Sequence, residues 1–359
     1  MIKVTETFLP PQSEFNEILK QSWELKWITN NGDLYKLLQK KLAAYLNVKY
    51  ILPMTNGTLP IQIALKEFGK QGEIITTPFS YVATTSSIIW EGCKPIYVDI
   101  DPQYFTIDSS LIEASITPKT TCILATHVYG NPCDIDKIEE IGLKYNLRVI
   151  YDGAHCFGVN YKDKSIFTYG DISTCSFHAT KIFHTAEGGA LFCNTNELYD
   201  QMWYLHNFGH KNQSTFEGIG INAKMSEIQA AMGLSVLPYM DYIINSRKSI
   251  CYNYDSLLDL SKVQKLKIRK DTEWNYSYYP IVFNDEKKLM SVMNELNNEM
   301  IFPRRYFYPS LNNLSYTKGF KCNVPVSESI ATRILCLPLY VGLKSQDVKR
   351  IAETVNKYS

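Results

Sequence analysis

The sequence predicts an α/β protein with a large domain around a mainly parallel sheet, followed by a smaller C-terminal α+β domain. Short runs of β-branched and aromatic residues alternate with longer segments of helical periodicity, and the strand-like runs are almost continuously apolar. This alternation is typical of a parallel sheet that helices cover on both faces. The 359 residues suit about two domains of roughly 150 residues each. Because basic and polar residues increase after residue 240, we expect domains over 1–240, which includes the N-terminal segment, and 241–359.

Six apolar runs are expected to form the large sheet. They are residues 74–77, 95–100, 121–126, 148–151, 172–177 and 189–194. Helices are expected between them, for example at 59–68 and at 134–145, where isoleucines recur on one face. In the C-terminal part, basic and apolar residues alternate from Lys265 to Arg269, which indicates a strand with one face in water.

Composition argues against several classes of function. The formal net charge is +1, so the chain lacks the basic surface expected for nucleic acid or an acidic membrane. No apolar run reaches the roughly 18 residues of a membrane-spanning helix, and the first residues do not read as a signal peptide. Nine cysteines are scattered singly, which favours reduced thiols in a cytoplasmic protein. We expect no metal site, because no histidine pair is accompanied by a suitable carboxylate.

Lys181 and Asp152 have the most specific chemistry in the sequence. Asp152 ends the apolar run that begins at Arg148, and Lys181 follows the expected strand 172–177. A lysine amine and a carboxylate at strand ends are the two groups that pyridoxal 5'-phosphate requires. The amine forms an imine with its aldehyde, and the carboxylate keeps its ring nitrogen protonated. By itself, Lys181 is equally well explained as a surface lysine in a polar loop, and Asp152 as a helix cap.

Two segments that precede this pair supply candidate cofactor ligands. Asn56, Gly57 and Thr58 come just before a predicted helix, where free backbone N–H groups would bind a phosphate. An ordinary helix-capping turn is the alternative. Tyr81, or alternatively Phe79, follows a strand end and is expected to stack on a flat heterocycle, although aromatic residues near strand ends usually belong to the core.

Further candidates lie beside the pair and in the C-terminal part. His155 follows the aspartate by three positions and is expected to hydrogen-bond the phenolic oxygen of the cofactor, while Ser176 is expected to bind its phosphate. The segment 303–309 combines basic and aromatic residues. Arg304 or Arg305 would pair with a diphosphate or carboxylate there, and the tyrosines would pack on a sugar or base. A packed loop with one surface arginine is the alternative.

Taken in order, these segments resemble the nucleotide-sugar aminotransferases of the DegT/StrS type, which have the pyridoxal-phosphate fold type I, an aspartate aminotransferase-like fold. Each segment is weak evidence alone, but their order and spacing along nearly the whole chain are specific. The matching segments are Asn56–Thr58, Pro78–Thr84, His127–Gly130, Asp152–His155, Ser176–Lys181, Glu187–Gly189, Gly220–Ala231, Arg304–Pro309 and Leu337–Leu339.

The resemblance implies roles for residues of this chain. Lys181 would be the catalytic residue that binds the cofactor and transfers the proton. Asn222 would reach the active site of a neighbouring subunit, which implies a homodimer with shared active sites; Lys224 stands where the family usually has arginine. The implied cofactor-binding residues are Asn56, Gly57, Thr58, Tyr81, Asp152, His155, Ser176, Lys181 and Asn222. The implied substrate-binding residues are Arg304, Tyr306, Tyr308 and His184.

The resemblance also implies the reaction, in which an amino group passes from L-glutamate to a keto-6-deoxy sugar nucleotide. The residues at 176–181, 29–32 and 303–309 are most similar to those of the branch that converts dTDP-4-keto-6-deoxyglucose to dTDP-4-amino-4,6-dideoxyglucose. A C-3 aminotransferase for a dTDP-3-keto-6-deoxyhexose stays an alternative. Sugar dehydratases on this scaffold carry histidine in place of the lysine, and a non-catalytic regulator would not need the lysine–aspartate pair.

Overall fold

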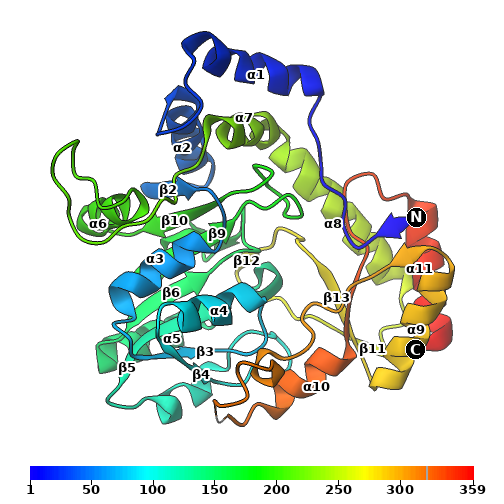
Figure 1. The fold of residues 1–359 in the computed structure, drawn as a ribbon. Helices are drawn as coiled ribbons and strands as arrows, with labels where there is room; N and C mark the ends of the chain where they lie inside the picture. The colour runs from blue at the N-terminus through cyan, green and yellow to red at the C-terminus, as the bar shows by residue number, and fades with distance from the viewer. Residues whose placement is uncertain (321) are drawn as a thin grey trace.

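A seven-stranded sheet forms the centre of the computed structural model, which describes residues 1–320 and 322–359 (Figure 1). All neighbouring strands run parallel except β10, which is antiparallel to both of its neighbours. The predicted mainly parallel sheet is therefore confirmed. The strand order is β2 (Tyr50–Met54), β10 (Gly189–Cys193), β9 (Ile172–Ser176), β6 (Arg148–Asp152), β5 (Thr120–Thr126), β3 (Glu73–Thr76) and β4 (Lys94–Tyr97).

Helices cover both faces of this sheet because successive strand residues point to opposite sides. In β6, Ile150 joins one hydrophobic cluster, while Val149 and Tyr151 join the other. The cluster with Ile150 is completed by α3 (Leu59–Phe68), α4 (Val82–Trp90) and α6 (Asn196–His206). The opposite cluster is completed by α2 (Asp33–Tyr45), α5 (Ile135–Tyr145) and α7 (Glu227–Val236).

The C-terminal part has its own antiparallel sheet and hydrophobic core. The sheet order is β11 (Val263–Lys265), β13 (Tyr279–Phe283) and β15 (Ile334–Leu337). Its core is formed with α8 (Met240–Leu257), α9 (Glu286–Asn298) and α11 (Ser345–Tyr358). A fourth helix, α10 (Pro325–Arg333), packs on a cluster shared with the loops of the large sheet.

Several short elements connect the two parts of the chain. β1 (Ile2–Lys3) pairs with β14 (Ile301–Phe302), so the N-terminus lies beside the C-terminal part (Figure 1). β12 (Thr272–Glu273) pairs with β7 (Asn160–Tyr161), which also pairs with β8 (Lys164–Ser165). The division at residue 240 stays a prediction, and the first residues pair with the part assigned to 241–359.

The predicted strand from Lys265 to Arg269 is wrong, because β11 ends at Lys265. Beyond that residue, the backbone amides bond to loops that connect strands of the seven-stranded sheet. The amide of Lys267 donates to the carbonyl of Gln103 at 3.1 Å, and that of Arg269 to Asn131 Oδ1 at 2.9 Å. Leu266 is buried and Lys267 is exposed, but Ile268 and Arg269 are both intermediate, so the expected wet face is present only in part.

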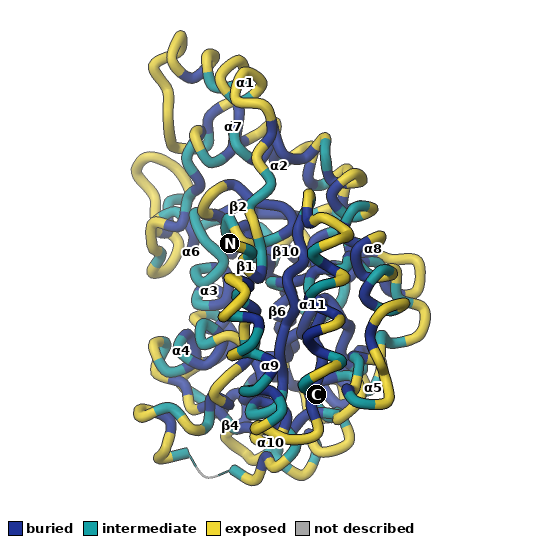
Figure 2. Tube along the Cα trace, turned by 90° about the vertical axis from the view of Figure 1, so that its right-hand side faces the viewer, coloured by how far each residue is buried: buried dark blue, intermediate teal, exposed yellow. Residues whose placement is uncertain are grey.

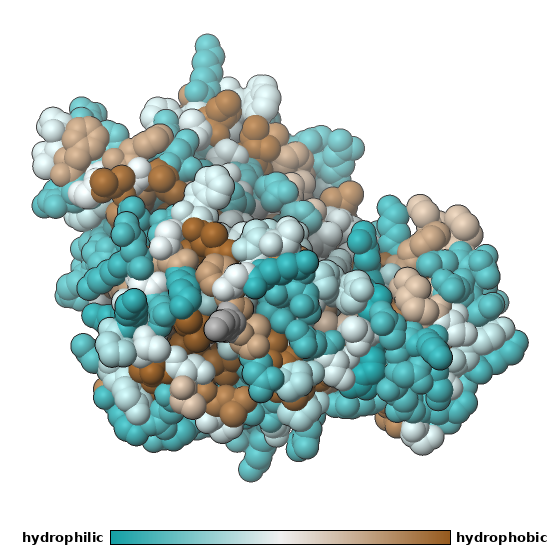
Figure 3. Space-filling view, turned by 60° about the horizontal axis from the view of Figure 1, so that its bottom comes forward, coloured by the Kyte–Doolittle hydropathy of each residue, from teal (hydrophilic) through white to brown (hydrophobic). Residues whose placement is uncertain are grey.

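The interior and the surface differ clearly in the remaining views. Figure 2 shows a buried trace through β6 and exposed residues along α1 (Gln12–Leu25), which projects from one end of the molecule. The face in Figure 3 is mainly hydrophilic, with scattered hydrophobic patches. Over residues 1–320 and 322–359, the helices include none with the length and apolar character needed to traverse a lipid bilayer.

Candidate active site

A cavity of about 280 Å³ lies at the carboxyl ends of β5, β6 and β9 and reaches the segment before β13. This position is the one where parallel α/β sheets usually bind ligands. The structure brings nine of the predicted site residues to its wall. They are Asn56, Gly57, Thr58, Tyr81, Asp152, His155, Ser176, Lys181 and Tyr306.

Asp152 lies at the end of β6 with only 4% of its surface exposed. Thr84 Oγ1 donates to one carboxylate oxygen at 2.8 Å, and the amide of Ala154 donates to the other at 3.1 Å. Burial raises the pKa of the Asp152 carboxyl, whereas these hydrogen bonds and the charge of Lys181 oppose that shift. In the described part of the chain no cation hydrogen-bonds this carboxylate, so it is free to pair with a cationic ligand in the cavity.

Lys181 reaches the cavity from the loop after β9. Its Nζ donates to the hydroxyl of Tyr278 at 3.4 Å. Burial of the amine lowers the pKa of Lys181, and the Asp152 carboxylate acts in the opposite direction. A lowered pKa increases the neutral fraction of the amine, which is the form that attacks a carbonyl.

His155 lies beside this pair as a neutral imidazole. Its Nδ1 accepts a hydrogen bond from the amide of Tyr129 at 3.0 Å, which places the ring proton on Nε2. Burial lowers the pKa of His155 well below its usual value. The ring also stacks on Phe307, with centroids 5.8 Å apart. His155 therefore offers one N–H donor and no positive charge.

The turn before α3 caps this helix and also brings the backbone of Gly57 close to Ser176. Asn56 Oδ1 accepts from the amides of Thr58 and Leu59, each at 2.9 Å, so the helix cap that the sequence left as an alternative is present. A Cβ on Gly57 would lie 2.6 Å from the Cβ of Ser176. Only glycine therefore fits here without displacing the serine. Gly57 and Ser176, which were both predicted to bind the phosphate, therefore lie next to each other.

We predict that Gly57→Ala lowers the affinity for the expected phosphate-bearing cofactor at least about tenfold, because the added methyl group fills the space between the turn and Ser176. Titration of cofactor fluorescence with the apoprotein measures this affinity. Gly319→Ala is the matched control, since a Cβ there would meet nothing within 4 Å. Equal affinities for the two variants would contradict a phosphate site at Gly57.

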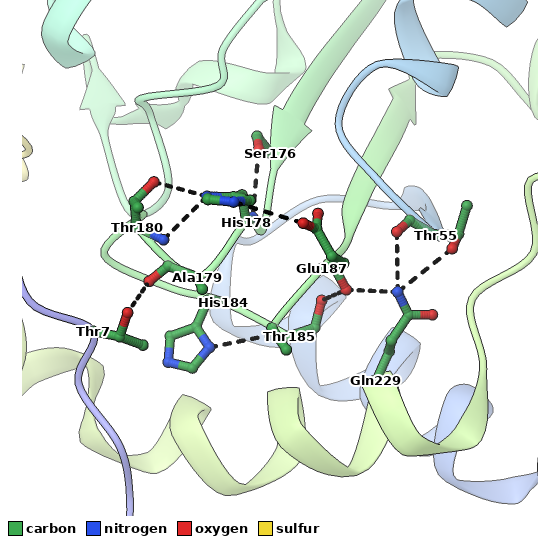
Figure 4. A network of polar contacts seen from close by, with 11 residues as sticks. Thr7, Thr55, Ser176, His178, Ala179, Thr180, His184, Thr185, Glu187 and Gln229 are labelled. Atoms are coloured by element: carbon green, nitrogen blue, oxygen red, sulfur yellow. Dashed lines mark hydrogen bonds and ion pairs between the residues drawn. The ribbon is translucent and has the colours of Figure 1, made fainter.

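The loop that carries Lys181 is fixed by polar contacts on both sides (Figure 4). His178 Nδ1 lies 2.8 Å from Thr180 Oγ1, and His178 Nε2 lies 3.6 Å from a carboxylate oxygen of Glu187. Gln229 Nε2, at the start of α7, donates to the Glu187 carbonyl at 2.6 Å and to the Thr55 carbonyl at 3.0 Å. These contacts hold the loop after β9 against the turn before α3.

His184 does not lie where a substrate ligand is needed. It is 1% exposed and is absent from the cavity wall. Its Nε2 lies 2.7 Å from the carbonyl of Phe8, and its Nδ1 accepts from the amide of Ala186 at 3.3 Å. Both ring nitrogens bond to the backbone, so the predicted substrate contact is corrected to a structural role in this chain.

The segment 303–309 borders a second hollow of about 440 Å³ that shares Tyr81, Tyr306 and Phe307 with the cavity. Arg304 and Tyr308 line this hollow and are exposed. The neighbouring arginine, Arg305, also borders the hollow but bonds to Glu286 and to the Thr332 carbonyl at 2.7 and 2.8 Å. The structure therefore leaves Arg304 as the arginine available to an anion.

Asn222 lies outside the cavity. It is exposed, and its Oδ1 accepts from Lys224 Nζ at 2.8 Å. Among the described residues, its side chain hydrogen-bonds to Lys224 and to no predicted cofactor ligand.

Among the residues of the site that were not predicted as ligands, Phe307 and Tyr278 line the cavity and Thr84 hydrogen-bonds Asp152. Thr84 ends a segment that drew attention only for its aromatic residues, although it lies in the first turn of α4 and reaches Asp152 at the end of β6. Phe307 belongs to the segment 303–309, in which only charged and phenolic side chains were considered. Tyr278 lies in a tyrosine-rich stretch that gave no signal of its own.

The chain is similar to known proteins along nearly its whole length. The DegT/DnrJ/EryC1/StrS aminotransferase family matches residues 11–356. The chain is 42% identical over 361 residues to dTDP-4-amino-4,6-dideoxy-D-glucose transaminase of Shigella dysenteriae, covering 99% of this chain and 98% of that protein. The Escherichia coli protein of the same name is 37% identical over 360 residues, with 98% and 97% covered. The structure of DesI in the presence of its TDP-sugar product has a TM-score of 0.94 at 28% identity, with 99% and 92% covered.

Proposed function

Because this chain belongs to the DegT/DnrJ/EryC1/StrS aminotransferase family, we propose that it transfers an amino group from L-glutamate to dTDP-4-keto-6-deoxyglucose, with pyridoxal 5'-phosphate as cofactor. The product would be dTDP-4-amino-4,6-dideoxyglucose. The observation that carries the proposal is the meeting of Lys181 and Asp152 in one cavity. Those two side chains come from different segments and supply the amine and the carboxylate that this cofactor requires.

The residues around the cavity fit pyridoxal phosphate. Asp152 is a buried carboxylate that lacks a hydrogen-bonded cation in the described chain, which suits a protonated ring nitrogen. The turn at Gly57 approaches Ser176 so closely that no side chain fits between them, which suits a phosphate bound by backbone and hydroxyl groups. His155 supplies a neutral N–H donor for the phenolic oxygen. When bound, the cofactor supplies an electron-accepting ring that stabilises negative charge on a substrate carbon.

The protein's own contribution centres on one proton. Lys181 Nζ accepts the proton from the carbon that bears the amino group of glutamate and donates a proton to the sugar carbon in the second half of the reaction. Both steps need the neutral amine at some stage, and burial favours that form. Asp152 would hold positive charge at the ring nitrogen, and Tyr81 and Phe307 border the cavity beside it.

The second hollow suits the nucleotide portion of the acceptor. Arg304 would pair with the diphosphate, and Tyr306 and Tyr308 would pack on the sugar or base. Because the hollow adjoins the cavity, a nucleotide bound there would bring the sugar carbon toward Lys181 and leave the charged diphosphate outside.

The test is amination of a panel of keto-sugar nucleotides with L-glutamate, with the aminated carbon located by NMR. A product aminated at C-4 of the dTDP-6-deoxyhexose supports the proposal. Amination only at C-3 would support the alternative, a C-3 aminotransferase for a dTDP-3-keto-6-deoxyhexose. A protein that holds the cofactor but aminates none of the panel would overturn the proposed acceptor.

We also propose a homodimer in which Asn222 reaches the cavity of the partner copy. Exposed apolar side chains support a surface that another copy covers: Trp23, Leu25, Trp27 and Ile28 at the end of α1, and Phe208, Phe216 and Ile219 close to Asn222 in sequence. Mixing inactive Asn222→Ala and Lys181→Ala proteins tests the sharing of sites. In heterodimers one site would be intact, so activity should return to about a quarter of wild type for random assortment. No recovery from verified heterodimers would contradict shared sites.

A further inference from the structure

The hydroxyl of Tyr278 meets the amine of Lys181 at the cavity wall. The O–N distance is 3.4 Å, and across residues 1–320 and 322–359 this is the hydroxyl's one hydrogen bond. Aromatic rings surround the phenol, with centroids at 5.6 Å for Tyr129, 4.8 Å for His155 and 5.6 Å for Tyr306. Burial raises the pKa of Tyr278, so the hydroxyl is neutral. The phenol is therefore a fixed, uncharged partner for the lysine.

The segment Trp274–Tyr278 is tied to the large domain on one side. The side chain of Asn275 donates at 2.8 and 2.9 Å to two carbonyls of the loop after β6. Trp274 Nε1 and Ser277 Oγ both donate to the carbonyl of Tyr129, at 2.8 and 2.9 Å. These bonds fix the backbone that enters β13 relative to the loops that form the cavity.

Arg247 of α8 holds the same segment from the other side. Its guanidinium donates to the carbonyls of Tyr276, Ser277 and Leu339, at 2.9, 2.6 and 2.9 Å. The side chain is buried, and among the described residues the hydrogen bonds of its guanidinium go to carbonyl oxygens and to no carboxylate. Burying an arginine without a carboxylate partner costs free energy, which the three charge-assisted hydrogen bonds offset. Two of those carbonyls directly precede Tyr278.

From this geometry we propose that Tyr278 is a positioning residue for Lys181, and that Arg247 acts on the lysine by holding Tyr278. This proposal rests on the proposed function, in which Lys181 carries a proton. The hydrogen bond to Tyr278 would orient the amine while it is not covalently bound. The hydroxyl accepts a hydrogen from Nζ and undergoes no covalent change. A hydrogen bond to the protonated amine favours that form, so Tyr278 partly opposes the effect of burial on Lys181.

The direct test is the titration of Lys181 in the apoprotein of the wild type and of Tyr278→Phe. Trace acetylation at a series of pH values, followed by peptide mass spectrometry, reports the apparent pKa of this amine. We expect the Phe variant to have a pKa lower by about half a unit, because it lacks the hydrogen bond that supports the protonated amine. In the cofactor-loaded enzyme we expect kcat to fall about tenfold while KM for glutamate changes less than about threefold.

Two further variants separate positioning from general disturbance. Tyr276→Phe is the matched control: it removes a hydroxyl two positions away that does not bond to Lys181, and it should titrate like the wild type. Arg247→Lys keeps the charge but cannot bond three carbonyls at once, so we expect it to lower the Lys181 pKa as well. Combined with Tyr278→Phe it should add no further shift, since both act through one hydroxyl.

The outcomes distinguish this proposal from the proposed function. A wild-type protein that binds no cofactor and transfers no amino group would refute the function, yet the apoprotein titrations would still decide the role of Tyr278. The positioning role is overturned if Tyr278→Phe titrates like the wild type, or if Tyr276→Phe shifts the pKa of Lys181 equally.

Discussion

Replacing Lys181 with alanine is expected to lower turnover with L-glutamate and a keto-sugar nucleotide by about 10⁴-fold or more, since one amine serves as both the covalent anchor and the proton carrier. The lysine is placed for both tasks. Its amine lies in the cavity with Asp152, and burial lowers its pKa. Two measurements check the expectation: steady-state turnover, and the visible absorbance of the purified protein supplied with pyridoxal phosphate.

Lys144→Ala is a suitable control for this substitution. Lys144 lies on the exposed surface of α5, where it pairs with Glu113. Removing it deletes the same chemical group far from the cavity, and turnover should not change. An alanine variant at 181 that kept both the absorbance and normal turnover would mean that another amine does the chemistry, and the mechanism proposed above would be wrong.

The two main site residues that could be predicted from the sequence are both marked by the residues that directly precede them. Asp152 and Lys181 both follow apolar strands whose type and limits are set by short runs of residues. Parallel strands that end at one edge of a sheet bring their following residues together, so the pairing could be inferred without long-range information. The six expected strands lie within a few residues of β3, β4, β5, β6, β9 and β10 for the same reason.

The residues that the sequence missed depend on contacts between distant parts of the chain. Tyr278 reaches Lys181 across 97 positions, and no local pattern distinguishes it from the tyrosines beside it. The segment after Lys265 reads as a strand because basic and apolar residues alternate, but its backbone amides bond to loops of the large sheet and not to a neighbouring strand. The resemblance implied His184 as a substrate ligand, whereas its ring turns to the N-terminal segment at Phe8.

The replacement Asp152→Asn is expected to have opposite effects on activity and stability. Turnover should fall about 10³-fold, because an amide cannot hold positive charge at the cofactor ring. The apoprotein should become more stable by about 1 kcal/mol, since a buried carboxylate without a bonded cation costs free energy that an amide avoids. The amide oxygen can still accept from Ala154, and its NH2 group can donate to Thr84, so the hydrogen-bond network survives.

The pH dependence of unfolding follows from the direction of the pKa shift. Burial raises the pKa of Asp152 in the folded protein, whereas in the unfolded chain it has its ordinary value of about 3.9. Between these two values the folded state binds more protons than the unfolded state. The free energy of unfolding therefore falls as pH rises through this window, and the loss is complete above the folded pKa. The Asn variant lacks this term, so its advantage should grow from about pH 4 toward neutrality.

Denaturant unfolding of the apoproteins at several pH values measures the gain in the free energy of unfolding and its pH dependence. Thr84→Val is the control, and it is expected to lower the free energy of unfolding. Loss of the Thr84 hydroxyl removes a hydrogen bond from the carboxylate, so it should destabilise the wild type, and less so the Asn variant, in which no charge needs support. If Asp152→Asn instead lowered stability at neutral pH, the carboxylate would be part of the framework. A site whose charge costs stability until a cationic ligand arrives is what a cofactor-binding carboxylate requires, since the same free energy then returns as affinity for the ligand.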